Sequence, residues 1–382
     1  MTVRVAVSPE LLVWAQNRSG KSEYELESQF SSLGEWIAER KEPTLKQLEK
    51  FANATFTPVG YFFLHEPPQE LLPIPDFRTI QSKSLEHASP HLLDTVYQCQ
   101  QRQEWYRDYA RINQEPTVPF IGSLSTKVAV AEAASLMREI LSFTREKRGK
   151  TWSEAFRLLV DNAEHLGVLV MVNGVVGSNT HRKLDPGEFR GFAISDELAP
   201  LIFVNGADSK AAQIFTLAHE LAHLWLGQSA VSDSDISHMP NNNTEKWCNQ
   251  VAAEFLVPAE ELQNVELSQN DITDQLDNLA RKFKVSTLVI LRRLYDANFL
   301  SNAEFQTAYS REEERIRTFL AARGGSGGSF YITQPVRTSR RFTSALIAST
   351  LEGQTLYRDA FQMLGFKKVS TFKELAHRFG YL

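Results

Sequence analysis

Two histidines four residues apart, with a glutamate between them, form the pattern in this sequence with the clearest chemistry. His219, Glu220 and His223 are the first, second and fifth residues of the segment HELAH, which apolar residues flank on both sides. Residues four apart lie on one face of an α-helix, so both imidazoles can bind the same Zn²⁺ ion. Glu220 then lies beside the metal, where it can take a proton from zinc-bound water. The pattern predicts a zinc hydrolase with one Zn²⁺ per chain and Glu220 as the general base.

A catalytic zinc site needs a third protein ligand, and the segment downstream offers two carboxylates. Glu254 lies among small and apolar residues in a predicted helix that Pro258 ends. A carboxylate in such surroundings costs free energy unless it is paired or binds a metal, so Glu254 is the predicted third ligand. Glu245 is the rival carboxylate. It begins the helix after a polar run, where an acidic residue near a helix N-terminus needs no metal.

The two motifs together resemble the ImmA/IrrE family of metallopeptidases. The resemblance rests on HELAH and on the later segment E-x-x-C-N-x-x-A-A-E-F-L-V-P, and it covers residues 160–300 approximately. It implies that His219, His223 and Glu254 bind zinc and that Glu220 is the general base. It also implies a cytoplasmic protease that cuts a partner repressor, in phage, mobile-element, stress-response or toxin–antitoxin regulation.

Two further features are expected to serve a peptide substrate. His238 follows the active helix and is a candidate donor to the oxyanion that develops on the scissile carbonyl. An edge strand beside an active helix can hold an extended peptide by backbone hydrogen bonds, and the hairpin of residues 189–205 is the predicted docking surface. The substrate is therefore expected to be a flexible segment of a protein.

Composition and charge indicate an intracellular globular protein. The chain has 382 residues, 42% of them hydrophobic, which predicts two or three domains with buried cores. Its net charge of -5 argues against general affinity for nucleic acid. Its two cysteines form no C-x-x-C pair, so neither a disulfide framework nor a cysteine-rich zinc site is expected. No signal peptide opens the chain and no apolar run reaches about 18 residues, so we expect a cytoplasmic protein without a membrane partner.

The predicted fold class is α+β and mostly helical, in five parts. These are an XRE-like helix-turn-helix domain at residues 1–68, a helical connecting region at 69–162, a zincin-like metallopeptidase core at 163–265, a helical and helix-turn-helix-like extension at 266–322, and a basic C-terminal module at 323–382 after a Gly/Ser-rich joint. The core is expected to contain a small sheet and the active-site helix.

The first and last parts raise the question of DNA binding. Residues 36–52 resemble the end of an XRE-type helix-turn-helix, whose recognition helix would lie in the major groove. Residues 1–65 carry seven Lys/Arg and eight Asp/Glu, a balance of -1, so docking to a protein or dimerisation is an equal alternative to DNA binding. Residues 323–382 carry nine Lys/Arg against three Asp/Glu, a balance of +6. The candidate contacts to DNA or a partner are Arg40, Lys41, Arg337, Arg340, Arg341, Lys367 and Lys368.

The combined prediction is a zinc-dependent endopeptidase that cleaves a repressor or antitoxin-like protein. The alternative is a non-proteolytic XRE-like DNA-binding regulator or antitoxin that binds and neutralises a partner toxin. An oligomer is compatible with either interpretation. A protease is expected to lose activity with Glu220→Gln while it keeps zinc, whereas a binding-only regulator keeps its function with the same change.

Overall fold

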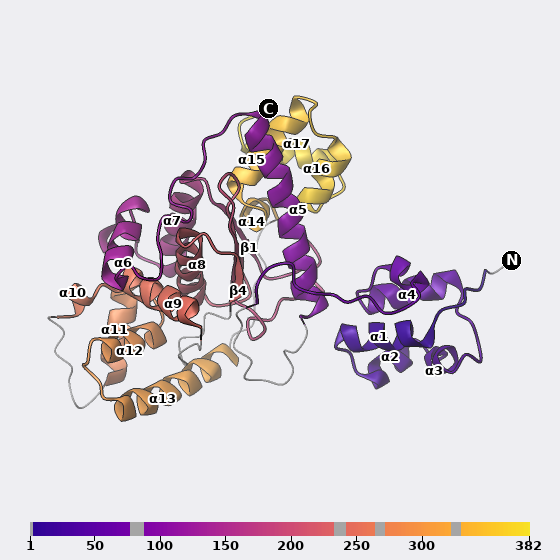
Figure 1. The fold of residues 1–382 in the computed structure, drawn as a ribbon, viewed down its shortest axis with the longest axis horizontal. Coiled ribbons are helices and arrows are strands. Elements are labelled where there is room, and N and C mark those ends of the chain that lie inside the picture. Colours follow the sequence, from indigo (N-terminus) through magenta and orange to yellow (C-terminus); the bar gives the residue numbers. More distant parts are fainter. Residues whose placement is uncertain (1–2, 77–87, 233–241, 264–271, 322–329) are drawn as a thin grey trace. The chain divides into compact units, whose positions relative to one another are not determined.

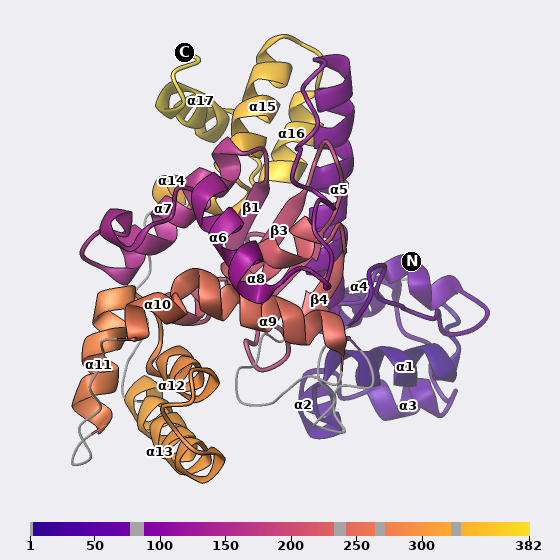
Figure 2. The same ribbon diagram turned by 60° about the vertical axis from the view of Figure 1, so that its left-hand side comes forward.

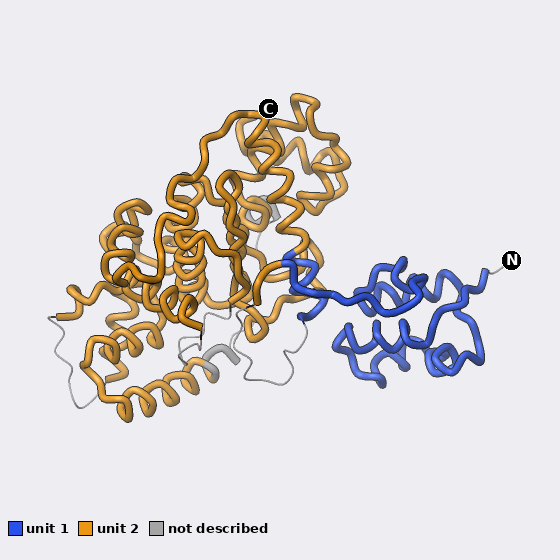
Figure 3. The backbone as a smooth tube through the Cα atoms, in the orientation of Figure 1, with its two compact units in different colours: residues 1–73, 80–96 blue, residues 74–79, 97–382 orange. Residues whose placement is uncertain are grey.

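The computed structural model describes residues 3–76, 88–232, 242–263, 272–321 and 330–382. The chain forms two compact units, one of residues 1–73 and 80–96 and one of residues 74–79 and 97–382 (Figure 3). Most elements are helices, and the strands form one four-stranded sheet (Figure 1). The predicted fold class, α+β and mostly helical, is confirmed. The finer division into five parts stays a prediction.

The first unit is a small bundle of helices. Its helices are α1 (Pro9–Ser19), α2 (Glu23–Gln29), α3 (Leu33–Ile37), α4 (Leu45–Ala54) and the 3₁₀ helix η1 (Val59–Phe63). Ser22 and Thr44 begin α2 and α4 with capping boxes, because each side chain accepts a backbone N–H that would otherwise lack a partner. Phe51 lies at the centre of the bundle, fully buried. The helix α3, part of the expected helix-turn-helix, is five residues long.

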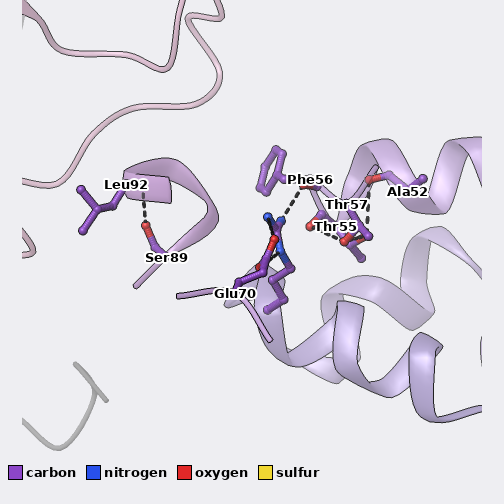
Figure 4. A network of polar contacts seen from close by, with 8 residues as sticks. Ala52, Thr55, Phe56, Thr57, Glu70, Ser89 and Leu92 are labelled. Atoms are coloured by element: carbon purple, nitrogen blue, oxygen red, sulfur yellow. Dashed lines mark hydrogen bonds and ion pairs between the residues drawn. The ribbon is translucent and has the colours of Figure 1, made fainter. Parts of the chain in front are cut away.

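An ion pair fastens the end of this unit to its first helix. The guanidinium of Arg18 donates to both carboxylate oxygens of Glu70, and it also donates to the carbonyl oxygen of Phe56 at 2.6 Å. Figure 4 shows Glu70 and Phe56 in this network, beside the hydroxyls of Thr55 and Thr57. The segment that leaves the first unit is therefore held at Glu70.

The sheet of the second unit has the order β1-β3-β2-β4. Its strands are β1 (Leu169–Asn173), β2 (Gly191–Ile194), β3 (Leu201–Asn205) and β4 (Ala230–Ser232). β1 and β3 are parallel, whereas β2 is antiparallel to both β3 and β4. The hairpin of β2 and β3 thus lies inside the sheet with both of its sides paired. The prediction that this hairpin receives the substrate is wrong. A peptide strand can be added only at a free edge of a sheet, and β2 and β3 each have a neighbouring strand on both sides.

Helices cover the sheet and position the HELAH segment. α8 (Lys210–Trp225) packs against β2, β3, α7 (Trp152–His165) and α9 (Asn243–Leu256), as the two ribbon views show (Figure 1, Figure 2). α9 also packs against α6 (Val130–Ile140). Every residue of α8 from Gln213 to Trp225 is buried, so this helix lies in the core rather than on the surface. Its first turn is capped by Ser209, whose hydroxyl accepts the N–H of Ala212.

The remaining helices of the second unit extend this core. They are α5 (Pro90–Ile112), which begins in the first unit, the 3₁₀ helix η3 (Arg145–Lys147), α10 (Ala259–Leu262), α11 (Ile272–Phe283), α12 (Thr287–Asp296), α13 (Asn302–Ala321), α14 (Phe330–Arg337), α15 (Arg340–Leu351), α16 (Tyr357–Leu364) and α17 (Val369–Arg378). Helices α14 and α15 pack against β1. Glu164 of α7 links the start of α15 to the core. Its carboxylate accepts hydrogen bonds from the hydroxyl of Ser339 and the N–H of Arg340, where α15 begins. Burial raises the pKa of Glu164 to about 7.

Candidate metal centre

Three side chains from two helices converge in the core of the second unit. His219 and His223 lie one turn apart on α8, and Glu245 lies in the first turn of α9. The two Nε2 atoms are 3.0 Å apart. Oε2 of Glu245 is 3.2 Å from Nε2 of His219, and its Oε1 is 2.9 Å from Nε2 of His223. The packing of α9 across α8 therefore adds a carboxylate to the histidine pair.

This group has the composition and the spacing of a catalytic zinc site. Two imidazoles and one carboxylate form a ligand set that such sites use, with a fourth position left for water. Ligands about 2.0–2.1 Å from a tetrahedral zinc ion lie about 3.3 Å from one another. The ligand atoms of His219, His223 and Glu245 all lie within 4.8 Å of one another, so they can close around one ion by small side-chain movements.

The electrostatics of the group also favour a cation. Burial by itself would raise the pKa of Glu245, but the charge of His219 and hydrogen bonds from both histidines lower it to about 2. Burial opposes charge on His219 as well, yet the carboxylate of Glu245 raises its pKa. Burial lowers the pKa of His223. Glu245 is therefore an ionised carboxylate in the core, and positive charge beside it is stabilising.

Glu220 lies next to these ligands and is held by the sheet. Its Oε1 accepts a hydrogen bond from the hydroxyl of Ser232 in β4, whereas its Oε2 is buried and has no hydrogen-bond partner among the described residues. Burial raises the pKa of Glu220 to about 8. Gly191 of β2 allows this close approach, because a Cβ there would lie 2.5 Å from Cγ2 of Thr216 and 3.2 Å from Oε1 of Glu220. One carboxylate oxygen is thus oriented by Ser232 and the other is left for a water molecule.

The structure corrects the prediction of Glu254 as third ligand. Glu254 lies nine residues after Glu245 on α9, and since each residue turns an α-helix by about 100°, the two carboxylates point in opposite directions. The carboxylate of Glu254 forms an ion pair with Arg293 of α12 and accepts the N–H of Ala259 at 3.1 Å. A carboxylate in this apolar segment does have a partner, as predicted. The partner is an arginine rather than a metal.

We expect Glu254→Gln to destabilise the protein without loss of zinc. Removing one member of a buried ion pair costs about 3–5 kcal/mol, because the other charge remains buried without its counter-ion. Urea unfolding measures the loss of stability, and elemental analysis measures the zinc. The matched control is Glu261→Gln, which removes a partly exposed partner of Arg145 and should cost about 1 kcal/mol or less. A zinc-free but fully stable Glu254→Gln protein would contradict this assignment.

Three arginines that the sequence did not single out hold the end of α9. Arg138 donates to the carbonyl oxygen of Glu254 at 2.6 Å, Arg148 donates to that of Leu256 at 2.7 Å, and Arg293 donates to that of Val257 at 2.9 Å. The last carbonyls of a helix have no partner within it, and basic side chains can supply one. These contacts fix the position of α9 and hence of Glu245. No short-range pattern in the sequence could reveal them, because each joins residues more than 30 positions apart.

Asn249 is a further residue that sequence reasoning missed. It lies one turn after Glu245 on α9, and its side-chain amide is one of the groups that raise the pKa of His219. The position four residues after a ligand on the same helix could have indicated it, because such residues share a face. Asn249 thus belongs to the surroundings of the histidine pair.

The other predicted site residues are not gathered at this centre. His238 lies outside the described residues. The guanidinium of Arg341 is engaged within the chain, where it donates to the hydroxyl of Tyr106 at 2.7 Å and to Glu115 at 2.9 Å. Lys41 pairs with Glu35. Three of the remaining basic residues are exposed, namely Arg40, Lys367 and Lys368. Arg340 lies over the ring of Phe379, and Arg337 is half-buried. Contacts of these five residues to DNA or a partner stay predictions.

Comparison with known families agrees with this centre. Residues 163–295 match a peptidase family described as the IrrE N-terminal-like domain, and this range contains His219, Glu220, His223 and Glu245. The predicted resemblance is confirmed for this region. Residues 338–378 match a family described as a domain of unknown function. No curated protein matches the chain. None of the described helices is both long enough and apolar enough to cross a membrane.

Proposed function

We propose that the second unit is a zinc-dependent endopeptidase with His219, His223 and Glu245 as metal ligands and Glu220 as general base. The observation that carries the proposal is the convergence of these three ligand atoms beside a carboxylate with one oxygen left for water. The match of residues 163–295 to a peptidase family supports it independently. The ligand set is that of a metal-dependent hydrolase, and zinc is the metal that two imidazoles and a carboxylate suit best.

Each residue of the centre has a definite task in peptide hydrolysis. When bound, zinc supplies a Lewis acid that polarises the scissile carbonyl and makes water more acidic. Glu220 accepts the proton of the attacking water at Oε2 and passes it to the leaving amine. Ser232 keeps Oε1 of Glu220 occupied, so the free oxygen keeps one orientation. Water becomes bonded to the carbonyl carbon, the C–N bond breaks, and the proton leaves on the new amine.

The proposed substrate is an extended segment of a partner repressor or antitoxin-like protein, and the proposed setting is the cytoplasm. The first unit, with its near-neutral balance of charge, would recognise that partner or DNA. A non-proteolytic regulator that uses the same fold to neutralise a toxin is the competing function. The retained Glu220, placed beside the ligands, favours the peptidase.

A metal-reconstitution experiment tests the proposal. The full chain is stripped with a chelator, one half is reloaded with one equivalent of Zn²⁺, and both halves are incubated with a mixture of cellular peptides. Mass spectrometry then identifies new peptide termini. We expect cleavage only in the zinc-loaded sample. Zinc binding with no cleavage of this mixture or of repressors from neighbouring genes would favour the regulator.

A further inference from the structure

The outer edge of β4 is taken by a segment of the same chain. The N–H of Val231 points away from β2 and donates to the carbonyl oxygen of Pro75 at 2.9 Å. Asp76 forms a parallel bridge with Val231. Ile74, just before them, is only 7% exposed, although its neighbours Pro73 and Pro75 are exposed. Residues 74–76 belong to the second unit, so this contact lies within one compact body.

This edge is the place in the sheet where a substrate strand could reach the proposed catalytic base. β2 pairs with the other side of β4 along its whole length. Ser232, next to Val231, donates to Glu220. A peptide that adds to the outer side of β4 would therefore run beside the residue that orients Glu220. Extended peptides commonly bind in this way, by backbone hydrogen bonds to a free sheet edge.

The metal ligands are closed off in the same structure. His219, Glu220 and His223 have no exposed surface, and Glu245 is 2% exposed. All three residues of β4 are buried as well. An endopeptidase must admit an extended chain to such a centre, so part of its own chain has to move first. The segment on β4 is the described part of the chain that occupies the required edge.

We propose that residues 74–76 form an intramolecular strap that competes with the substrate for the outer edge of β4. This inference rests on the proposed peptidase function and adds its regulation. Pro73 and Pro75 have no N–H to donate, so the strap can form fewer backbone hydrogen bonds than an ordinary peptide strand. Ile74 is its apolar anchor. A substrate strand with a full set of N–H groups can therefore displace the strap.

The test compares the zinc-loaded full chain with Ile74→Asp and, as a milder change, Ile74→Ser. A charge at Ile74 cannot stay in its buried site, so the strap should leave β4. We expect the KM for a cleaved peptide to fall about tenfold with kcat unchanged, because the competitor is lost. The matched control is Leu71→Asp, which puts the same charge on a side chain that is 74% exposed and should leave KM unchanged.

Two further measurements separate the strap from the peptidase proposal. Hydrogen exchange of the Val231 amide should become faster in both Ile74 variants, whether or not the protein cuts peptides. A synthetic peptide of residues 70–79 should inhibit Ile74→Asp more strongly than the unaltered chain. Cleavage with the same KM in every variant would overturn the strap while leaving the peptidase intact. Faster exchange at Val231 without any cleavage would retain the strap and reject the peptidase. Cleavage of the chain within residues 74–76 would show that the segment is a substrate and overturn the strap.

Discussion

Replacing Glu245 by alanine is expected to remove stoichiometric zinc from the purified protein. Glu245 is the one carboxylate within reach of both histidine Nε2 atoms among the described residues, at 3.2 and 2.9 Å. Two imidazoles alone make an incomplete site, because catalytic zinc normally has three protein ligands. Changes to residues that merely support a ligand already weaken metal binding about 10–100-fold, so the loss of a ligand should cost at least about a hundredfold.

Elemental analysis and titration against a chromophoric chelator measure this effect. The unaltered chain should hold one zinc, and Glu245→Ala should hold little after the same purification. Glu254→Gln is the control, because it alters a carboxylate of the same helix that binds Arg293 instead. Retention of zinc by Glu245→Ala together with its loss from Glu254→Gln would restore the assignment that the sequence suggested.

Glu220→Gln is expected to abolish peptide cleavage while zinc binding and stability are kept. The amide has the size of the carboxylate, and its oxygen can still accept the hydrogen bond from Ser232. It cannot accept a proton from water, and general-base catalysis contributes about 10²–10⁴-fold to such reactions. We therefore expect the rate of cleavage to fall by about this factor with little change in metal content.

Cleavage rates at saturating peptide, measured beside elemental analysis, check this result. The same substitution at the exposed Glu260 is the matched control and should leave the rate unchanged. Equal cleavage by the Glu220→Gln protein would mean that Glu220 is not the base. If that protein also neutralised a partner as well as the unaltered chain does, the non-proteolytic regulator would be the better description.

The grouping of His219, Glu220 and His223 could be predicted because all three lie within five consecutive residues of one helix. His219 and His223 share a helix face as a consequence of helical periodicity, and Glu220 follows from its place in the same five residues. Strands β2 and β3 lie within the predicted hairpin of residues 189–205. The α+β class followed from the same short-range patterns. Each of these features depends on residues within one helix or one hairpin.

The proposed third ligand and the proposed substrate edge could not be predicted because they depend on packing between distant segments. Glu245 and Glu254 lie on the same helix, and only the packing of α9 across α8 decides which of them faces the histidines. Arg293, which pairs with Glu254, lies 39 residues further along the chain. β4 follows the active helix and yet pairs with β2, and Pro75 reaches it from far earlier in the sequence. Sequence by itself thus determined which helix carries the two histidines and Glu220. The tertiary structure decided which carboxylate faces them and which sheet edge lies beside Glu220. The reason is that local periodicity orients a side chain on its own helix and cannot specify which neighbour that helix will meet.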